Sequence, residues 1–338
     1  MLQRSKFAID FNELNARKSI RNRIDSTARG SIPLSMVKPA TPAWKVAAAA
    51  AHLVGAGGLP LATDFMLDLS SDEKPALLFA HGFGQTRKAW RQTAGTLAMH
   101  GYGSLAYDAR GHGESGRNEE TQAYSGTQFT DDLIIVAGEL PKPPVLVAAS
   151  MGGLFGLLAE ARWPGLFRAM VLVDITPRWE TRGFERILGF MTAHPQGFDS
   201  LDQAADAIAS YLPHRARRKT PDELREVLRA GSDGRWRWHW DPRLIDELAR
   251  DSERHQDAIA QAARAVNCPV LLVSGGRSDL VSEETVKHFR SLVPHARHEH
   301  LPAATHMVAG DDNTAFTTVV LNHLAELSAA GHPGGTIQ

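Results

Sequence analysis

The sequence predicts a doubly wound α/β fold, in which helices cover both faces of a mostly parallel sheet and a helical cap is inserted. Short, continuous apolar runs recur along the chain, as in parallel strands that are buried on both faces. Stretches with helical periodicity alternate with these runs. One long interruption, residues 176–252, is helical in pattern and has no buried-strand run. Its length is too great for a crossover loop, so we interpret it as a cap over the carboxyl edge of the sheet.

The predicted elements follow one another in a regular order along the chain. Apolar runs predict strands at 76–80, 103–108, 145–149, 169–174, 269–274 and 297–301. Helical periodicity predicts helices at 89–99, 129–140, 151–161, 283–292 and 315–327. The core of the domain therefore takes residues 46–175 and 253–338, with the cap between them.

The first 45 residues differ in composition from the rest of the chain. Residues 1–40 contain eight Lys and Arg against three acidic residues. Phe7, Phe11 and Leu14 fall at helical spacing, so this basic arm could form an amphipathic helix that packs on the body or on a second subunit. A solvated arm fits the composition equally well, and a homo-oligomer through the arm stays one of two alternatives.

Bulk properties exclude several classes of protein. The 338 residues carry a net charge of -1, so no concentrated basic face is expected for nucleic acid. Cys268 is the single cysteine, which rules out an intrachain disulfide and a thiolate metal cluster. No apolar stretch reaches the roughly 18 residues of a membrane span. We expect a cytoplasmic protein whose partner is a small-molecule substrate, with no nucleic acid and no membrane.

The segment VLVAASMGGLFG places one serine, Ser150, between a predicted strand and a predicted helix. A nucleophilic serine needs a sharp turn there, and its neighbours two positions away must be small. These neighbours are Ala148 and Gly152, and alanine takes the place of the usual first glycine. The helix that begins near Met151 would direct its positive end at the serine. The segment predicts a nucleophile elbow.

A glycine-containing loop, HGFG, follows the first predicted strand. Its Phe83 N–H, together with the Met151 N–H, would form a two-donor oxyanion hole. We expect His81 in this loop, and His112 in a later glycine turn, to be structural hydrogen-bonding groups rather than catalysts.

His306 is the best candidate for the general base, because it follows the last predicted strand in a loop of small residues. An orienting carboxylate should also end a strand. Asp279 fits this position, since the bend at Gly275 and Gly276 turns its loop toward the site. Asp174, at the end of an earlier strand, is the alternative acid. The chain order Ser150, Asp279, His306 is the serine–acid–histidine order of a known architecture.

Two further histidines, His298 and His300, are two residues apart on a predicted strand. They could in principle bind a metal, but no third ligand is evident in the sequence. We therefore predict no metal site, and the serine chemistry requires no organic cofactor.

Five motifs in this order resemble those of the α/β-hydrolase superfamily, over roughly residues 55–325. They are HGFG (81–84), YDARGHGES (107–115), AASMGG (148–153), SGGRSD (274–279) and THMVAG (305–310). The resemblance implies the α/β-hydrolase fold, with Ser150 as nucleophile, His306 as base and Asp279 as acid. It also implies that Phe83 and Met151 supply the oxyanion hole through their backbones.

The chain departs from the family pattern in places. Ala149 stands where many relatives carry histidine, and the basic arm has no counterpart that we recognise. Relatives that open epoxides or displace halide use aspartate at the position of Ser150, so those reactions are not expected here.

The cap supplies candidates for the substrate pocket. In the segment RWRWHW, an extended chain would place Trp236, Trp238 and Trp240 on one face. They could form an aromatic wall over the serine, with Phe190 beside them, or could anchor the cap to the body. Arg178 could meet a substrate carboxylate or lie solvated.

These residues predict a serine hydrolase that cleaves a small carboxylic ester or a related acyl compound through an acyl-enzyme. The same triad could serve a carbon–carbon bond hydrolase of diketone-type substrates, a lactonase or an amidase. A non-catalytic ligand receptor with this fold is the alternative of a different class.

Overall fold

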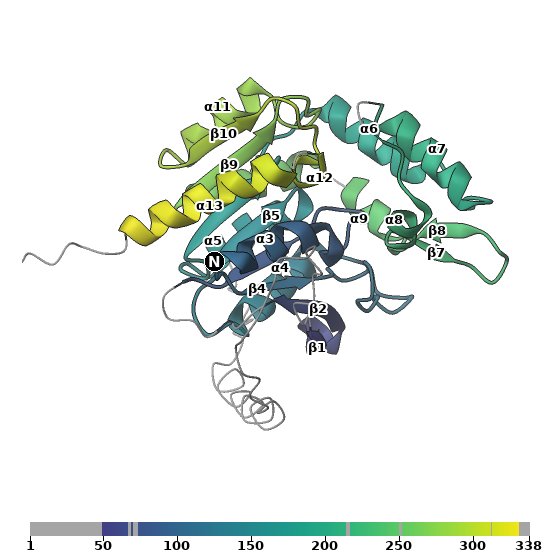
Figure 1. Ribbon diagram of the computed structural model, residues 1–338, viewed down its shortest axis with the longest axis horizontal. Helices are drawn as coiled ribbons and strands as arrows, with labels where there is room; N and C mark the ends of the chain where they lie inside the picture. The colour runs from purple at the N-terminus through teal and green to yellow at the C-terminus, as the bar shows by residue number, and fades with distance from the viewer. Residues whose placement is uncertain are drawn as a thin grey trace, which may run out of the picture. The chain divides into compact units, whose positions relative to one another are not determined.

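The computed structural model describes residues 49–66, 69, 74–213, 217–249, 252–311 and 313–330 (Figure 1). The predicted basic arm, residues 1–45, lies outside this range, so its helix and its role in an oligomer stay predictions. None of the described helices is long and apolar enough to cross a membrane.

Eight strands of the described chain form one sheet in the order β1-β2-β4-β3-β5-β6-β9-β10. β1 and β2 pair antiparallel, as do β2 and β4, and the remaining pairs are parallel. The strands are β1 (Ala49–Val54), β2 (Pro60–Met66), β3 (Leu77–Ala80), β4 (Ser104–Tyr107), β5 (Val145–Ala149), β6 (Ala169–Val173), β9 (Val270–Gly275) and β10 (Arg297–Leu301). All six predicted strands are confirmed, whereas the antiparallel pair β1 and β2 was not predicted.

Helices cover both faces of this sheet, as the apolar strands require. Alternate strand residues separate into two cores: Leu146 and Leu172 lie in one, Val147 and Val171 in the other. The first core is closed by α4 (Gly126–Gly138), α5 (Met151–Arg162), α10 (Ser252–Arg264) and α11 (Glu283–Leu292). The second is closed by α3 (Arg91–Met99) and α13 (Asn313–Ala330). Short helical segments are η2 (Ala56–Gly58), η3 (Arg87–Trp90) and α12 (Val308–Asp311).

The chain between β6 and α10 leaves the sheet, and its elements gather to one side of it (Figure 1). They are α6 (Thr181–Thr192), α7 (Leu201–Tyr211), α8 (Pro221–Arg225), β7 (Leu228–Ala230), β8 (Trp236–Trp238) and α9 (Leu244–Ala249). This region is mostly helical, as predicted, but it also contains the β7–β8 hairpin, which was not predicted. A small core of its own, with Phe198, Ile208 and Leu224 buried, packs α7, α8 and the β7–β8 hairpin together, whereas Leu244 of α9 lies in the first core of the sheet. That these elements act as a cap over the site stays a prediction.

Candidate active site

Ser150 lies on a sharp turn between β5 and α5. Its backbone has φ 45° and ψ -117°, a conformation that a non-glycine residue rarely adopts and that costs energy to hold. Gly152 is required beside it, because a Cβ there would lie 2.7 Å from the Ala80 carbonyl oxygen. Ala148 is fully buried within β5, so alanine is accommodated where the family usually has glycine. The turn has the geometry of a nucleophile elbow.

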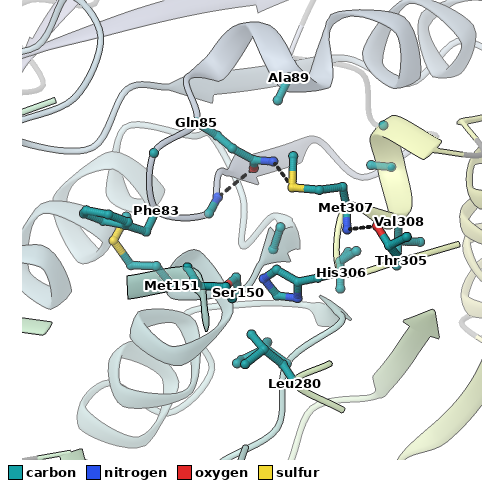
Figure 2. A pocket seen from close by; sticks show the side chains of 18 of the residues that line it. Phe83, Gln85, Ala89, Ser150, Met151, Leu280, Thr305, His306, Met307 and Val308 are labelled. Atoms are coloured by element: carbon teal, nitrogen blue, oxygen red, sulfur yellow. Dashed lines mark hydrogen bonds between the residues drawn. The ribbon is translucent and has the colours of Figure 1, made fainter. Parts of the chain in front are cut away.

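His306 follows β10, and its ring lies beside Ser150 (Figure 2). Its Nδ1 is 2.7 Å from Oδ2 of Asp174. Because a carboxylate only accepts, Nδ1 donates its hydrogen and Nε2 keeps a basic lone pair. Within the described residues Ser150 forms no hydrogen bond with His306, which is common before substrate binds. Both residues line the same cavity.

Asp174 is the carboxylate that the structure places on His306. It ends β6, is fully buried and has a positive φ of 48°. The Gly275 N–H donates to Oδ1 at 2.8 Å, and the Ser278 hydroxyl donates to Oδ2. Three donors therefore hold this carboxylate in one orientation, and it can in turn hold one tautomer of His306.

The prediction that Asp279 pairs with His306 is wrong. Oδ2 of Asp279 accepts a hydrogen bond from Nη1 of Arg186 on α6 at 2.7 Å. The glycine bend after β9 does turn the chain back, as expected, but it directs Gly275 and Ser278 to Asp174 and leaves Asp279 facing the cap. The alternative acid of the sequence analysis occupies the position beside the histidine.

The HGFG loop lies against the serine, since a Cβ on Gly82 would be 3.3 Å from the Ser150 Cβ. Figure 2 shows Phe83 and Met151 on one side of Ser150 and His306 on the other. In the described chain neither the Phe83 N–H nor the Met151 N–H donates to another group. Met151 is the first residue of α5, where the helix dipole favours negative charge. Both donors are thus available to a developing oxyanion.

Three buried histidines lie in or against the HGFG loop. His81 accepts from the Ala109 N–H at 2.9 Å through Nε2, and its Nδ1 is 2.8 Å from the Gly82 oxygen. His112 packs edge-on against the rings of His81 and Phe83. Burial lowers the pKa of His81 and lowers that of His112 well below its usual value. These two are structural groups, as expected.

The third buried histidine, His239, was not singled out in the sequence. It follows β8, and burial lowers its pKa to about 3. Its Nδ1 accepts from the Gly113 N–H at 2.7 Å, and its Nε2 is 3.1 Å from the Gly84 oxygen. The signal that could have found it is the position of a histidine between two tryptophans in RWRWHW.

The cavity above Ser150 has a volume of about 960 Å³. Its apolar lining comes from the α5 side of the core and from the cap: Leu154, Phe155, Leu158, Ile175, Trp179, Phe184, Ile187, Phe190, Met191, Ile208, Leu212 and Trp238. Charged side chains also line it, among them Arg186, Arg277 and Asp279. A space of this size and character suits a substrate with a sizeable apolar part.

Of the predicted pocket residues, Phe190 and Trp238 line the cavity, whereas Trp236, Trp240 and Arg178 do not. Trp240 is 3% exposed, and its ring packs against Phe83 with centroids 5.0 Å apart. Trp236 pairs through its backbone with the chain near the start of α7. Arg178 is exposed outside the cavity. The tryptophans were expected on one face, but β8 ends at Trp238, so Trp240 no longer follows the alternation.

His298 and His300 both approach Ser274, and their rings lie edge to face with centroids 6.3 Å apart. His298 Nε2 lies 2.7 Å from the Ser274 Oγ, and His300 Nδ1 lies 3.4 Å from it. Among the residues that the structure describes, no three His, Cys, Asp or Glu side chains are grouped to hold a metal ion.

The comparison with protein families adds to this geometry. A family model described as "Serine aminopeptidase, S33" matches residues 71–313 of the chain. The chain belongs to this α/β-hydrolase family. It is a hydrolase, as the family and the named relatives show.

The curated relatives of this α/β-hydrolase have names that state different activities. Esterase Rv0045c of Mycobacterium tuberculosis is 28% identical over 259 residues, which cover 73% of this chain and 81% of the relative. A 2-(acetamidomethylene)succinate hydrolase of Mesorhizobium japonicum is 28% identical over 238 residues, which cover 69% of this chain and 82% of the relative. The chain is similar to both relatives over most of its length, and the two names do not state the same activity.

Solved structures show the same fold. The crystal structure of an E-2-(acetamidomethylene)succinate hydrolase superposes with a TM-score of 0.69 at 22% identity, covering 82% of this chain and 99% of that one. The Mycobacterium tuberculosis esterase Rv0045c superposes with a TM-score of 0.63 at 22% identity, covering 95% and 100%. The doubly wound sheet predicted from the sequence is thus confirmed as an α/β-hydrolase fold.

Proposed function

We propose that this hydrolase cleaves a carboxylic ester with a sizeable apolar part through an acyl-enzyme on Ser150. The observation that carries the proposal is the hydrogen bond between His306 Nδ1 and Asp174, beside a strained serine and two available backbone donors. A buried carboxylate in this position fixes the imidazole tautomer whose Nε2 can accept the serine proton. Asp174 takes the role that the sequence analysis gave to Asp279.

In the first half of the reaction, the Ser150 hydroxyl gives its proton to His306 Nε2 while Oγ bonds to the ester carbonyl carbon. The carbonyl oxygen becomes an oxyanion, which accepts from the N–H groups of Phe83 and Met151. His306 then donates the proton from Nε2 to the leaving alcohol oxygen as the carbon–oxygen bond breaks. The product of this half is the acyl-enzyme and a free alcohol.

In the second half, water gives a proton to His306 Nε2 and its oxygen attacks the acyl carbon. The tetrahedral species breaks down when Ser150 Oγ leaves and takes the proton back from His306. A carboxylic acid is released and the enzyme returns to its starting state. Asp174 stays ionised and stabilises the imidazolium in both halves.

The apolar side chains Phe184, Ile187 and Met191 of α6 line the cavity and suit the apolar part of an ester. The cap also contributes charged lining residues, among them Arg186 and Arg217, so a carbon–carbon bond hydrolase of diketone-type substrates stays an alternative. An amide is the second candidate, because a matched relative is named 2-(acetamidomethylene)succinate hydrolase.

A substrate panel tests the proposal with the wild type, Ser150→Ala and Ser291→Ala. Ser291 is an exposed residue of α11 outside the cavity lining, so it is a matched control. The panel holds p-nitrophenyl esters of increasing chain length, an aryl amide, a carbamate, a lactone and a vinylogous 1,5-diketone. We expect ester turnover that rises with chain length, is lost in Ser150→Ala and is kept in Ser291→Ala. Turnover that survives in Ser150→Ala would contradict the serine mechanism.

A fluorophosphonate probe separates an enzyme with an untested substrate from a ligand receptor. We expect one adduct at Ser150 even if no panel member is cleaved, since the probe needs only an activated serine. Absence of both turnover and adduct would favour the receptor.

A further inference from the structure

The two glycines of the HGFG loop leave the position of Phe83 to be fixed by the hydrogen bonds that hold the loop. Gly84 has φ 73°, which glycine adopts at no steric cost but does not itself enforce. The Gly82 carbonyl and the Phe83 N–H belong to one trans peptide group, so they point in opposite directions. Whatever holds the Gly82 carbonyl therefore sets the direction of the Phe83 N–H, and whatever holds the Gly84 carbonyl fixes the chain that follows Phe83.

Donors hold both of these carbonyls. The Gly82 oxygen lies 2.8 Å from His81 Nδ1 and accepts from the Gln85 N–H at 3.1 Å. The Gly84 oxygen lies 3.1 Å from His239 Nε2. The first two contacts are local to the loop, whereas His239 reaches the loop from the end of the β7–β8 hairpin, 155 residues away in the chain.

The tautomer of His239 follows from its other contact. Its Nδ1 receives the Gly113 N–H at 2.7 Å, so Nδ1 carries no hydrogen. In the neutral ring the hydrogen is then on Nε2, which donates to the Gly84 oxygen. The side chain is 2% exposed, and its burial opposes protonation. The groups that face it are the uncharged rings of His81 and His112 and the cations Arg117 and Arg229, which also oppose a positive charge.

The backbone of His239 joins the oxyanion loop to the cavity wall. Its N–H donates to the Val227 oxygen, and its carbonyl accepts from Arg117. Trp238 on one side lines the cavity, and Trp240 on the other packs against the Phe83 ring. A substrate that presses on Trp238 therefore acts on the same segment that holds the Gly84 carbonyl.

We propose that His239 is a positioning residue through which the cap holds the Phe83 N–H in place for the oxyanion. This inference rests on the proposed serine mechanism, and it adds a residue that contacts neither substrate nor the reacting atoms. His239 then stabilises the transition state, in which the oxyanion forms, and contributes little to binding of the uncharged ester.

Two amide variants separate the contacts of His239. His239→Asn keeps a group near the place of Nδ1 that can accept from Gly113, but it is too short to reach the Gly84 oxygen. His239→Gln places an amide N–H near the position of Nε2, so it can restore that donor. His295→Asn, at an exposed histidine outside the cavity, is the matched control.

The readouts are kcat, KM and the affinity of two ketones built on the best ester of the panel. A trifluoromethyl ketone adds to Ser150 and places an oxyanion in the hole, whereas the matched methyl ketone only fills the cavity. Displacing an oxyanion donor costs about 10- to 100-fold in rate. We expect His239→Asn to lose kcat and trifluoromethyl ketone affinity by this same factor, with KM and methyl ketone affinity unchanged. His239→Gln should recover most of the loss, and His295→Asn should match the wild type.

Three results would overturn the inference. They are a wild-type kcat in His239→Asn, an equal loss in both His239 variants, and weaker binding of the methyl ketone in step with the trifluoromethyl ketone. If the wild type itself forms no trifluoromethyl ketone adduct, the proposed serine mechanism fails first.

A measurement on the wild type covers the case in which His239→Asn does not fold. Nitrogen NMR of the full chain labelled in histidine reports the tautomer directly. We expect His239 to carry its hydrogen on Nε2 and to stay neutral down to pH 5. A hydrogen on Nδ1, or protonation near pH 6.5, would contradict the donor role.

Discussion

Asp174 and Asp279 follow adjacent strands at the same edge of the sheet, but their surroundings differ. Asp174 follows β6, is fully buried and takes hydrogen bonds from a backbone N–H, a hydroxyl and His306. Asp279 follows β9, has a side chain that is 27% exposed and pairs with Arg186, which is 49% exposed. Burial with several fixed donors makes one carboxylate rigid, whereas solvent screens the other pair.

Position at a strand end therefore does not by itself pair a carboxylate with His306. Asp279 instead lies where the cap meets the core. Gly183 of α6 packs so closely there that a Cβ on it would overlap the Asp279 carbonyl oxygen at 1.8 Å. The Glu180 N–H also donates to the Leu280 oxygen at 3.0 Å. We infer that the loop containing Asp279 is the surface of the core against which α6 packs.

The largest expected effect comes from Asp174→Asn. Asparagine keeps the shape of the side chain but cannot fix the required tautomer, so we expect kcat to fall about 10³- to 10⁴-fold. Asp279→Asn should leave kcat within about threefold, because an exposed ion pair contributes at most about 1 kcal/mol. Steady-state kinetics on the best ester measure both. The reverse ranking would restore Asp279 as the acid.

A second comparison uses two glycines of the same helix. Gly183→Ala forces α6 away from the Asp279 loop and should lower the free energy of unfolding by about 1–3 kcal/mol. A Cβ on Gly189 meets no atom within 4 Å, so Gly189→Ala should be neutral or stabilise the helix by up to about 1 kcal/mol. Urea unfolding, followed by tryptophan fluorescence, measures both variants. Equal unfolding free energies of Gly183→Ala and Gly189→Ala would show that α6 does not pack against this loop.

The burial of His239 makes the free energy of unfolding depend on pH. The pKa of His239 is about 3 in the folded chain and near 6.5 when unfolded, so its neutral form stabilises the fold fully above pH 6.5. Between pH 6.5 and 3 the unfolded state binds the proton first, and stability falls by up to about 1.4 kcal/mol per pH unit from this group. His239→Gln should therefore lose less stability than the wild type between pH 6.5 and 5. Parallel curves of unfolding free energy against pH would contradict this.

The smallest effect is expected from Arg186→Met. It removes the partner of Asp279 and a guanidinium that stacks 4.7 Å from the Tyr211 ring. Because the pair is exposed, we expect KM to rise by no more than about fivefold, with kcat unchanged. Arg182→Met, at an exposed position of the same helix, is the control. A loss of kcat in Arg186→Met would mean that the pair acts on the chemistry.

Much of the fold and part of the site could be predicted from the sequence. The six parallel strands, the turn at Ser150 and the loop of His306 follow from local pattern, because apolar runs and small residues report directly on burial and turns. Hydropathy did not find β1, which begins in an alanine-rich stretch, and it did not find β2. The sequence favoured Asp279 over Asp174, and this choice was wrong, because the pairing depends on which loop donates hydrogen bonds to which carboxylate.

Contacts between distant segments decide the remaining residues of the site. Alternation predicted one face for three tryptophans, but only Trp238 lines the cavity, because the strand ends there and Trp240 enters the core. His239 lies between them and contacts two glycine turns that are far away in sequence. No local pattern encodes such contacts.

The rate of fluorophosphonate labelling at Ser150 is the sharpest test of the Ser150–His306–Asp174 assignment, since it needs no knowledge of the substrate. It is measured by intact mass for the wild type, Asp174→Asn and Asp279→Asn. We predict that Asp279→Asn labels at the wild-type rate and that Asp174→Asn labels more than about 100-fold more slowly. Fast labelling of Asp174→Asn together with slow labelling of Asp279→Asn would contradict the Ser150–His306–Asp174 assignment.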